Sequence, residues 1–327
     1  MKAYVHDKNG CNIKEMPEPQ AGEGEVVVRI KYAGLNRRDL YIPGRRGDNP
    51  DSPLILGSDG AGVIETVGFG VSDLKQGDEV LINPSLRWKK NSPAPPAEFD
   101  ILGMPDHGTF AEKIVLSADQ IEKIPEHLTM KEAAVVALAG TTGYRAMFTK
   151  GRLQRGETVL IPGAGSGVAT FLIQFAKKIG ARVIVSSRSK EKRERALAIG
   201  ADLAIDTHAD WEQELADEKI DLVIDSVGRA TFNKSLAVLK KGGRIVVFGA
   251  TTEDKVEFDL RTFFYNQQEI IGSTMGSREE LRDMLELMEK YNIHPEIDGV
   301  LPIDEAEVAF EKLHTNHQFG KLVLEIE

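Results

Sequence analysis

The sequence predicts an α/β protein that combines a doubly wound parallel sheet with a second domain of short strands. A strand, a glycine-rich turn, a helix and a second strand follow one another between Glu157 and Arg188. Strand and helix patterns then alternate regularly as far as Phe248, whereas the residues before Ser117 form short strands bounded by glycine and aspartate. Alternation of this kind indicates a parallel sheet, and short strands with turns indicate a small barrel or sandwich.

The region from Glu157 to Arg188 has the pattern of a dinucleotide-binding βαβ unit. In order, it contains a strand at 158–161, a small-residue turn at 163–169, a helix that ends at Ile179 before Gly180, and the strand Arg182–Ser187. Apolar residues recur in the helix at 3.6-residue spacing, so one helix face packs on a sheet. The turn directs backbone N–H groups and a positive helix end at a phosphate. The predicted phosphate contacts are Gly163, Ala164, Gly165, Ser166, Gly167 and Val168.

The turn departs from the strict G-x-G-x-x-G fingerprint, because no register places glycine at all three positions. Ala169 stands at the third position, where alanine is tolerated. A glycine-rich turn by itself also joins strands to helices for purely structural reasons. The strand before it, the helix after it and the further strand–helix units favour a bound dinucleotide.

The end of the second strand predicts which dinucleotide binds. An NAD site has Asp or Glu about 20 residues after the glycines, where it accepts hydrogen bonds from the ribose hydroxyls. This chain has Ser187 there, followed by Arg188 and Lys192. A hydroxyl and a guanidinium can bind a 2′-phosphate, which a carboxylate would repel. We therefore predict NADP(H). The alternative is that these cations only solvate the first turn of a surface helix.

Composition and charge exclude several classes of partner. The 327 residues suffice for two domains, and the net charge of −10 makes a nucleic-acid or anionic membrane partner unfavourable. The opening residues lack the apolar core of a signal peptide, and no apolar run approaches membrane-spanning length. The single cysteine, Cys11, excludes an internal disulfide and fits a reducing compartment. We expect a cytoplasmic protein.

Short strands are predicted in the first part of the chain and alternating elements in the second. The expected strands of the first part are 26–30, 60–68, Glu79–Ile82 and 110–116. The proline-rich stretch 83–107 between them is predicted to be a long surface loop without regular elements. The expected helices of the second part are 130–139, 142–148, 190–199 and 210–217, and its further strands are 202–206, 221–225 and 244–248.

Small residues follow the last two of these strands. Ligands of doubly wound sheets lie at the carboxyl ends of strands, which makes these residues candidate cofactor neighbours. They are Val227, Gly228, Gly249, Ala250 and Thr251. The alternative is that small residues simply form tight turns.

Six motifs occur in order along the whole chain. They are residues 33–39 (AGLNRRD), 56–62 (LGSDGAG), 77–80 (GDEV), 108–112 (GTFAE), 141–144 (TTGY) and 320–324 (GKLVL). In this combination the sequence resembles the medium-chain dehydrogenase/reductase superfamily, which contains zinc alcohol dehydrogenases and zinc-free quinone oxidoreductases. The resemblance implies a GroES-like catalytic domain over 1–125 and 272–327, with a Rossmann domain inserted over 126–271.

The resemblance also predicts that no metal is bound. Zinc-dependent relatives have cysteine at the position of Asn36, a His-Glu pair at Ser58 and Asp59, and cysteine at Leu138. A catalytic Zn²⁺ needs about three protein ligands, and only Asp59 could contribute. The four cysteines that bind the family's structural zinc are absent from the stretch 83–107.

Without zinc, no Lewis acid stabilises an alkoxide, so the predicted chemistry is reduction. We expect hydride transfer from NADPH to a quinone, an enone or an activated carbonyl. The resemblance places Asn36 near the nicotinamide and the substrate as a hydrogen-bond donor, with Arg37 and Tyr41 as further candidates. Asn36 could instead only cap a turn. The resemblance also places Thr142, Ile271, Gly272, Ser273, Thr274 and Lys321 near the cofactor.

Two other functions remain open at the level of sequence. Some relatives reduce enoyl thioesters with a tyrosine donor, a role that Tyr41 could fill. A non-catalytic NADPH-binding protein of the crystallin or redox-sensor type would keep the dinucleotide turn but have a blocked substrate cleft. The resemblance further implies a homodimer that pairs near the segment 255–260, and a small-molecule substrate.

Overall fold

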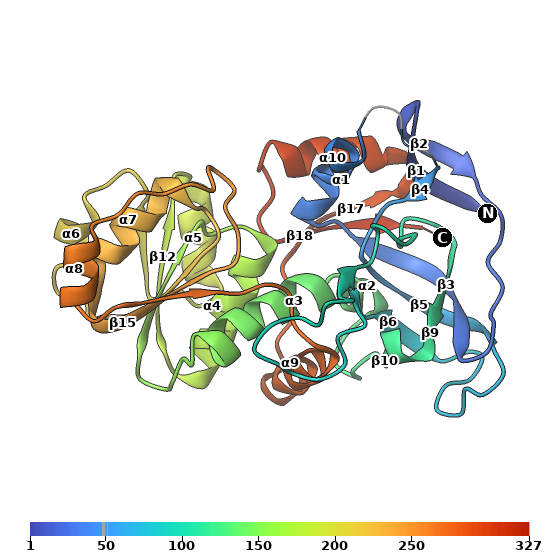
Figure 1. Cartoon of the computed structure of the whole chain (residues 1–327), viewed down its shortest axis with the longest axis horizontal. Helices are drawn as coiled ribbons and strands as arrows, with labels where there is room; N and C mark the ends of the chain where they lie inside the picture. The colour runs from blue at the N-terminus through green and yellow to red at the C-terminus, as the bar shows by residue number, and fades with distance from the viewer. Residues whose placement is uncertain (48–49, 51, 327) are drawn as a thin grey trace. The chain divides into compact units, whose positions relative to one another are not determined.

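The computed structural model describes residues 1–47, 50 and 52–326, and the chain separates into two compact units. Unit 1 comprises Met1–Ala139 and Gly276–Glu327, and unit 2 comprises Gly140–Met275. Figure 1 shows the blue N-terminal strands and the red C-terminal strands together in unit 1. The first junction lies later than the predicted one after residue 125, because helix α2 (Met130–Ala133) packs on strands of unit 1. That each unit folds as a separate domain stays a prediction.

Unit 1 is a β domain of short strands, as predicted. Its strands are β1 (Lys2–Asp7), β2 (Gly10–Glu15), β3 (Glu25–Gly34), β4 (Leu54–Ile55), β5 (Asp59–Val67), β6 (Glu79–Ile82), β7 (Ser85–Leu86), β8 (Asp100–Ile101), β9 (Lys113–Ser117), β10 (Ile121–Lys123), β17 (Ile297–Pro302) and β18 (Lys321–Glu325). Within the described residues, its main sheet has the order β10-β6-β5-β3-β18-β17, and β9 also pairs with β3. A smaller sheet has the order β2-β1-β4.

The C-terminal strand β18 lies inside the main sheet of unit 1, between β3 and β17. β18 pairs antiparallel with β3, with Val323 opposite Gly34 and Leu324 opposite Ala33, and parallel with β17 on its other side. Val28 and Ile30 of β3 pack in one core cluster with Leu322 and Leu324 of β18, all fully or almost fully buried. Apolar burial across this pairing therefore joins the two ends of the chain.

The stretch 83–107 was predicted to be a loop without elements, and this is wrong in detail. The strands β7 and β8 pair antiparallel within it. Leu86, Trp88 and Leu102 are buried, and Trp88 packs edge-on against Phe99 at 5.2 Å. The stretch therefore has a small apolar centre of its own, which its prolines and charges obscure in the sequence.

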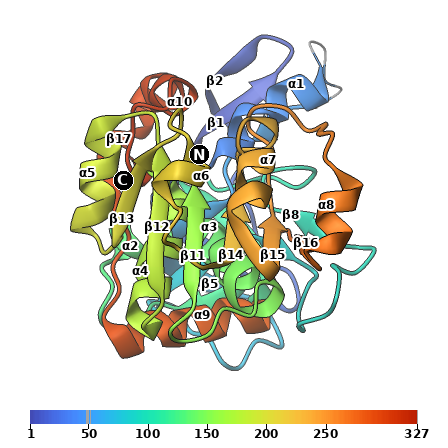
Figure 2. The same cartoon turned by 90° about the vertical axis from the view of Figure 1, so that its left-hand side faces the viewer.

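Unit 2 is a doubly wound Rossmann-type domain, as predicted. Its elements are β11 (Thr158–Pro162), α4 (Gly167–Ile179), β12 (Arg182–Ser187), α5 (Lys190–Ala198), β13 (Leu203–Asp206), α6 (Trp211–Glu214), β14 (Ile220–Asp225), α7 (Arg229–Val238), β15 (Leu239–Val247), α8 (Leu260–Tyr265) and β16 (Glu269–Gly272). All pairs in this sheet are parallel, in the order β13-β12-β11-β14-β15-β16, and the strands lie side by side in Figure 2. The order reverses beside β11, which places a topological switch point next to the predicted turn.

Several details of the second part differ from the prediction. The expected helix break near residue 140 lies earlier, because α3 (Ala137–Tyr144) continues through Gly140 and passes into a π-helical turn over Arg145–Lys150. The last strand of the sheet is β16, which the sequence analysis missed. The segment 255–260, near which a homodimer was predicted to pair, has no regular structure over 255–259, and α8 begins at Leu260.

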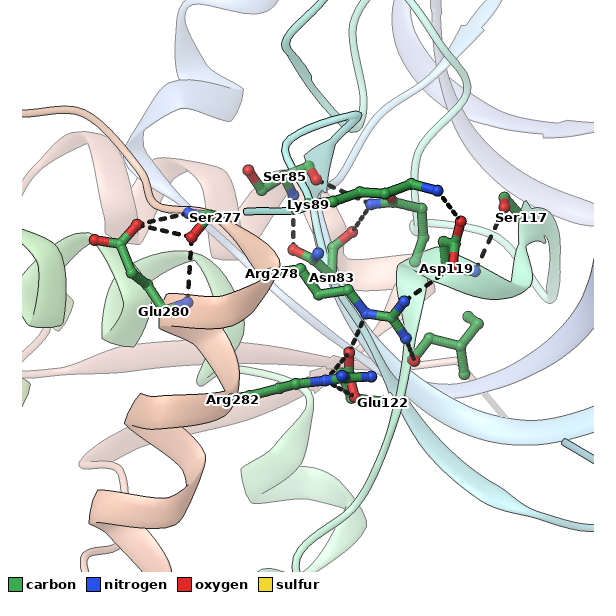
Figure 3. A network of polar contacts seen from close by, with 12 residues as sticks. Asn83, Ser85, Lys89, Ser117, Asp119, Glu122, Ser277, Arg278, Glu280 and Arg282 are labelled. Atoms are coloured by element: carbon green, nitrogen blue, oxygen red, sulfur yellow. Dashed lines mark hydrogen bonds and ion pairs between the residues drawn. The ribbon is translucent and has the colours of Figure 1, made fainter. Parts of the chain in front are cut away.

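Unit 1 contains three further α-helices among the described residues, α1 (Ile42–Arg46), α9 (Arg278–Tyr291) and α10 (Ala306–His314). A polar network holds the start of α9, as Figure 3 shows. Arg278 Nε and Arg282 Nε both donate to Glu122, at 2.5 and 3.0 Å, and Arg278 Nη1 reaches Asp119 at 3.0 Å. The network holds the start of α9 against β10.

Among the described residues, no helix combines the length and apolarity that crossing a bilayer requires.

Candidate functional site

The turn between β11 and α4 has a backbone conformation that requires glycine. Gly163 and Gly165 have φ values of +84° and +105°. The N–H groups of Gly163 and Ala164 donate to the carbonyl of Ser186, at 3.0 and 2.9 Å. A Cβ atom on Gly163 would lie 3.0 Å from Val227 Cγ2, so side chains are excluded from this position both by conformation and by space. The turn is thereby held against the ends of β12 and β14.

The N-terminus of α4 presents unpaired donors. Ser166 caps the helix, because its hydroxyl accepts from the N–H of Ala169 at 3.1 Å. The N–H groups of residues 165–168 donate to no group in the described part of the chain. Together with the positive end of a 13-residue helix, these donors form a site suited to a phosphate.

The end of β12 places Ser187 beside an acidic strand end. Ser187 lies opposite Asp206 in the register of β12 and β13, and its hydroxyl accepts from the N–H of Ser189 at 3.2 Å. Arg193 donates to the Ser187 carbonyl at 2.6 Å and to Asp206 at 2.9 Å. A hydrogen bond from the His208 N–H and the nearby Arg193 guanidinium hold the pKa of Asp206 below its usual range. Asp206 is therefore an ionised group that the sequence analysis missed, and Arg193 is already paired.

Of the two predicted cations, Arg188 is exposed, and the backbone of Lys192 is bonded to the cap of α5. The Lys192 N–H donates to Ser189 Oγ at 3.3 Å. Arg188 immediately follows Ser187, the last residue of β12, so Arg188 is nearer in sequence to the end of this strand than Lys192 is.

The remaining predicted cofactor residues of unit 2 lie along the same edge of the sheet. Asp225, Val247 and Gly272 are aligned in the registers of β14, β15 and β16, so the turns that follow them are neighbours. The residues of these turns are Val227, Gly228, Gly249, Ala250, Thr251, Ser273 and Thr274. The buried hydroxyl of Ser273 has no hydrogen-bond partner among the described residues, which leaves it available to a ligand.

Asp225 anchors one of these turns. Its Oδ1 accepts from the N–H groups of Val227 and Gly228, at 2.7 and 3.1 Å, and its Oδ2 accepts from Thr231 Oγ1 at 2.7 Å. Burial raises the pKa of Asp225. Both oxygens are occupied, so this acid holds the backbone of the turn. Thr142 lies in α3, where its hydroxyl contacts Sδ of Met275 at 3.6 Å.

In unit 1, Asn36 belongs to a buried polar cluster. Its amide oxygen accepts from Lys321 Nζ at 2.6 Å, and its amide nitrogen donates to Asp59 Oδ2 at 2.9 Å. The other oxygen of Asp59 accepts from the N–H of Leu138 at 2.8 Å. The fully buried Asp39 caps the following 3₁₀ turn by accepting from the Asn36 N–H at 2.8 Å. Asn36 is therefore the residue at which the turn begins, and its side chain joins two buried charges.

The predicted catalytic residues of unit 1 are not brought together. Arg37 donates to Asn316 in the turn after α10, and Tyr41 is 46% exposed. Arg38, which the sequence analysis did not select, is partly buried, and its Nη1 donates to Ser58 Oγ at 2.6 Å and to the Leu102 carbonyl at 2.7 Å. A sequence signal for this cluster existed, because Asp39, Asp59 and Lys321 are charged residues within motifs otherwise rich in small and apolar residues.

Comparisons with known proteins agree with this architecture. The family described as "Alcohol dehydrogenase GroES-like domain" matches residues 22–126, and the family described as "Zinc-binding dehydrogenase" matches residues 167–290. A zinc-type alcohol dehydrogenase-like protein of Schizosaccharomyces pombe is 33% identical over 100% of this chain and 99% of its own. An acryloyl-coenzyme A reductase of Sulfurisphaera tokodaii is 30% identical over 99% of each chain.

One solved structure is also similar over its whole length. A crystal structure described as an NAD-dependent alcohol dehydrogenase superposes with a TM-score of 0.92, with 34% identity over 100% of each chain.

The chain belongs to the medium-chain dehydrogenase/reductase superfamily. It is therefore an oxidoreductase, as the sequence analysis predicted.

The residues at the positions of the superfamily's catalytic zinc do not fit a metal ion. Ser58 Oγ is taken up by Arg38 and the Leu102 carbonyl, and both oxygens of Asp59 are engaged. The ammonium of Lys321 lies among the remaining oxygens, where it would repel Zn²⁺. In the described part of the chain, no group of three or more His, Cys, Asp or Glu side chains is arranged to hold a metal. The absence of zinc stays a prediction, and this donor set supports it.

Proposed function

We propose that this superfamily member is a zinc-independent, NADPH-dependent reductase of α,β-unsaturated carbonyl compounds, quinones or activated carbonyls. The observation that carries the proposal is the dinucleotide turn, where unpaired N–H groups at the start of α4 accompany a hydroxyl at the end of β12. The N–H groups of residues 165–168 would hold the pyrophosphate. Ser187 and Arg188 would hold the 2′-phosphate, which a carboxylate at the Ser187 position would repel.

The Asp206 carboxylate is the main argument for NADH. It lies on the neighbouring strand end, where an acid could accept from a ribose hydroxyl. However, Arg193 and the His208 N–H already occupy its two oxygens. The hydroxyl of Ser187 and the guanidinium of Arg188, at the end of β12, therefore favour the phosphorylated cofactor NADPH.

Hydride addition to an enone places negative charge on the carbonyl oxygen. When bound, NADPH supplies the hydride to the β-carbon, and a proton is then needed at the α-carbon. A donor aimed at the oxygen stabilises the developing enolate. We assign that donor to Asn36, whose second amide N–H reaches only the Gly34 carbonyl, at a long 3.4 Å. The proton reaches the α-carbon from solvent or a ribose hydroxyl.

The affinity for NADPH and NADH, measured by fluorescence titration, tests the cofactor assignment. We expect the wild type to prefer NADPH by about tenfold or more, because one charge-assisted hydrogen bond contributes about 1.5–3 kcal/mol. Ser187→Asp should remove or reverse this preference. Ser72→Asp, at an exposed position of unit 1, adds the same charge and should not change it. Equal affinities in the wild type would contradict the phosphate site, and no binding of either nucleotide would favour a non-catalytic protein.

A specific observation favours enoyl thioesters as the substrate within this class. The acryloyl-coenzyme A reductase of Sulfurisphaera tokodaii is similar along its whole length. Turnover of acryloyl-CoA and of 9,10-phenanthrenequinone should be compared in the wild type and in Tyr41→Phe. Loss of thioester reduction in Tyr41→Phe would identify the tyrosine as the donor. Unchanged thioester turnover would leave the proton to solvent or the ribose.

We also propose that the protein is a homodimer that pairs through the edge strand β16. This strand bonds only to β15 within unit 2 and is largely exposed, with Ile270 at 39%. The neighbouring α8 exposes Leu260, Phe264 and Tyr265. Unpaired strand edges next to apolar side chains favour pairing with a second copy.

A further inference from the structure

Lys321 has an environment unusual for a lysine. Its side chain is 3% exposed, and its Nζ lies 2.8 Å from the Leu35 carbonyl, 2.6 Å from Asn36 Oδ1 and 3.4 Å from Asp59 Oδ2. The backbone places it there. Gly320 has a φ of +94°, and the Lys321 N–H donates to the Glu296 carbonyl at 2.8 Å as β18 begins.

The three oxygens account for the full hydrogen-bonding capacity of an ammonium group. An ammonium has three N–H donors and no acceptor. Each of the three oxygens takes one donor, so none remains for a cofactor phosphate or ribose. The geometry therefore gives no support to the predicted cofactor contact of Lys321.

The same contacts set the orientation of the Asn36 amide. Because the cation lies on the Oδ1 side, the NH₂ group must point away from it, toward Asp59 Oδ2 and the Gly34 carbonyl. A charge-assisted hydrogen bond to the amide oxygen also polarises the amide, which strengthens donation from its nitrogen.

We propose that Lys321 is a positioning residue whose ammonium is a built-in cation, held by the oxygens of Leu35, Asn36 and Asp59, that orients and polarises the Asn36 amide for the substrate. The Lys321 ammonium lies in the cluster in which zinc-dependent relatives would bind their metal. Unlike a metal ion, it carries one charge and is covalently attached to the chain. The inference rests on the proposed role of Asn36, and the test below separates the two.

Chemical rescue of Lys321→Ala tests the proposal. The substitution removes the atoms of n-propylamine, so n-propylammonium can refill the space. We expect kcat to fall about 100-fold, as when a reacting group is misplaced, with the KM for NADPH unchanged. n-Propylammonium should raise kcat of the variant but not of the wild type. Tetramethylammonium has no N–H donor and n-propanol has no charge, so neither should restore activity. Lys312→Ala, which removes a partly exposed ion pair with Asp298, is the matched control and should retain wild-type kcat.

A second readout is independent of turnover. n-Propylammonium should raise the melting temperature of Lys321→Ala and leave that of the wild type unchanged. If this shift occurs while the wild type reduces none of the proposed substrates, the proposed function fails and the cation site stands. Absence of both the shift and the rescue overturns the proposal. An increased KM for NADPH with unchanged kcat also overturns it, because that result identifies a cofactor contact.

If Lys321→Ala does not fold, the double variant Lys321→Met with Asp59→Asn replaces it. The pair keeps the volume and removes both charges, which a protein interior tolerates better than one unpaired charge. A folded double variant with wild-type kcat overturns the proposal, and a folded one with reduced kcat and unchanged KM for NADPH supports it.

Discussion

Asp39 shows how burial sets the behaviour of a single side chain in this protein. It is fully buried, and its Oδ1 has no hydrogen-bond partner among the described residues. Burial raises the pKa of Asp39 to about 6, although Arg38 and the Asn36 N–H favour its ionised form. In the unfolded chain the same group titrates near 3.8.

The folded state therefore binds more protons than the unfolded state between about pH 4 and pH 6, and Asp39 lowers stability as pH rises through that window. Two pKa units correspond to about 3 kcal/mol. Asp39→Asn keeps an acceptor for the Asn36 N–H but cannot ionise. We expect the free energy of unfolding of the wild type, relative to this variant, to fall by up to about 3 kcal/mol from pH 4 to pH 7. Urea titrations across this range measure it, and parallel profiles for the two proteins would contradict it.

Residue positions were predictable where the signal is local. Ser187 was selected as a candidate because it was predicted to end a strand at a fixed distance from a glycine turn, and it does end β12. The bond between Lys321 and Asn36 joins residues 285 positions apart, and no periodicity connects them. Asp206 was missed for a similar reason, since its position beside Ser187 depends on the register between two strands.

Elements were predictable where periodicity and end signals agree. The helix predicted to end at Ile179 does end there. The next residue, Gly180, has a φ of +84° and terminates the helix in the left-handed conformation. β12 and β6 have the predicted bounds. The π-helical turn after α3 was not predictable, because it keeps helical composition and differs only in hydrogen bonding.

The polar network at the start of α9 should contribute measurably to stability. Glu122 accepts hydrogen bonds from Arg278 and Arg282 (Figure 3). The side chain of Glu122 is only 11% exposed and that of Arg278 only 18%. Glu122→Gln leaves the two guanidinium groups facing a neutral amide. We expect a loss of about 2–3 kcal/mol in the free energy of unfolding, slightly below the range for a fully buried pair.

The control is Glu194→Gln, which removes an exposed pair with Lys190 at 3.8 Å. Exposed pairs contribute about 0–1 kcal/mol, so this variant should unfold almost as the wild type does. Denaturant unfolding of both variants decides the matter. Equal losses would show that burial does not distinguish the two pairs.

At the scale of the whole molecule, the edge of unit 2 predicts the oligomeric state. Light scattering at micromolar concentration should give about 72 kDa, which is 2 × 36.0 kDa. Ile270→Asp places a charge on the β16 edge and should shift the mass to that of one chain. Phe69→Asp, at an 82% exposed position of unit 1, should leave the dimer intact. A wild-type mass near 36.0 kDa would refute the dimer.

The division of unit 1 into two segments also orders events on the ribosome. Unit 2 is complete in sequence once Met275 has been synthesised, whereas the main sheet of unit 1 still lacks β17 and β18, of which β18 pairs with β3. Chains emerge N-terminus first at about 5–20 residues per second, so unit 2 can fold while the β18 side of β3 is still unpaired. During that interval nascent chains on one messenger are vulnerable to cross-pairing at β3, and chaperone demand is expected to be highest just before residues 321–325 emerge.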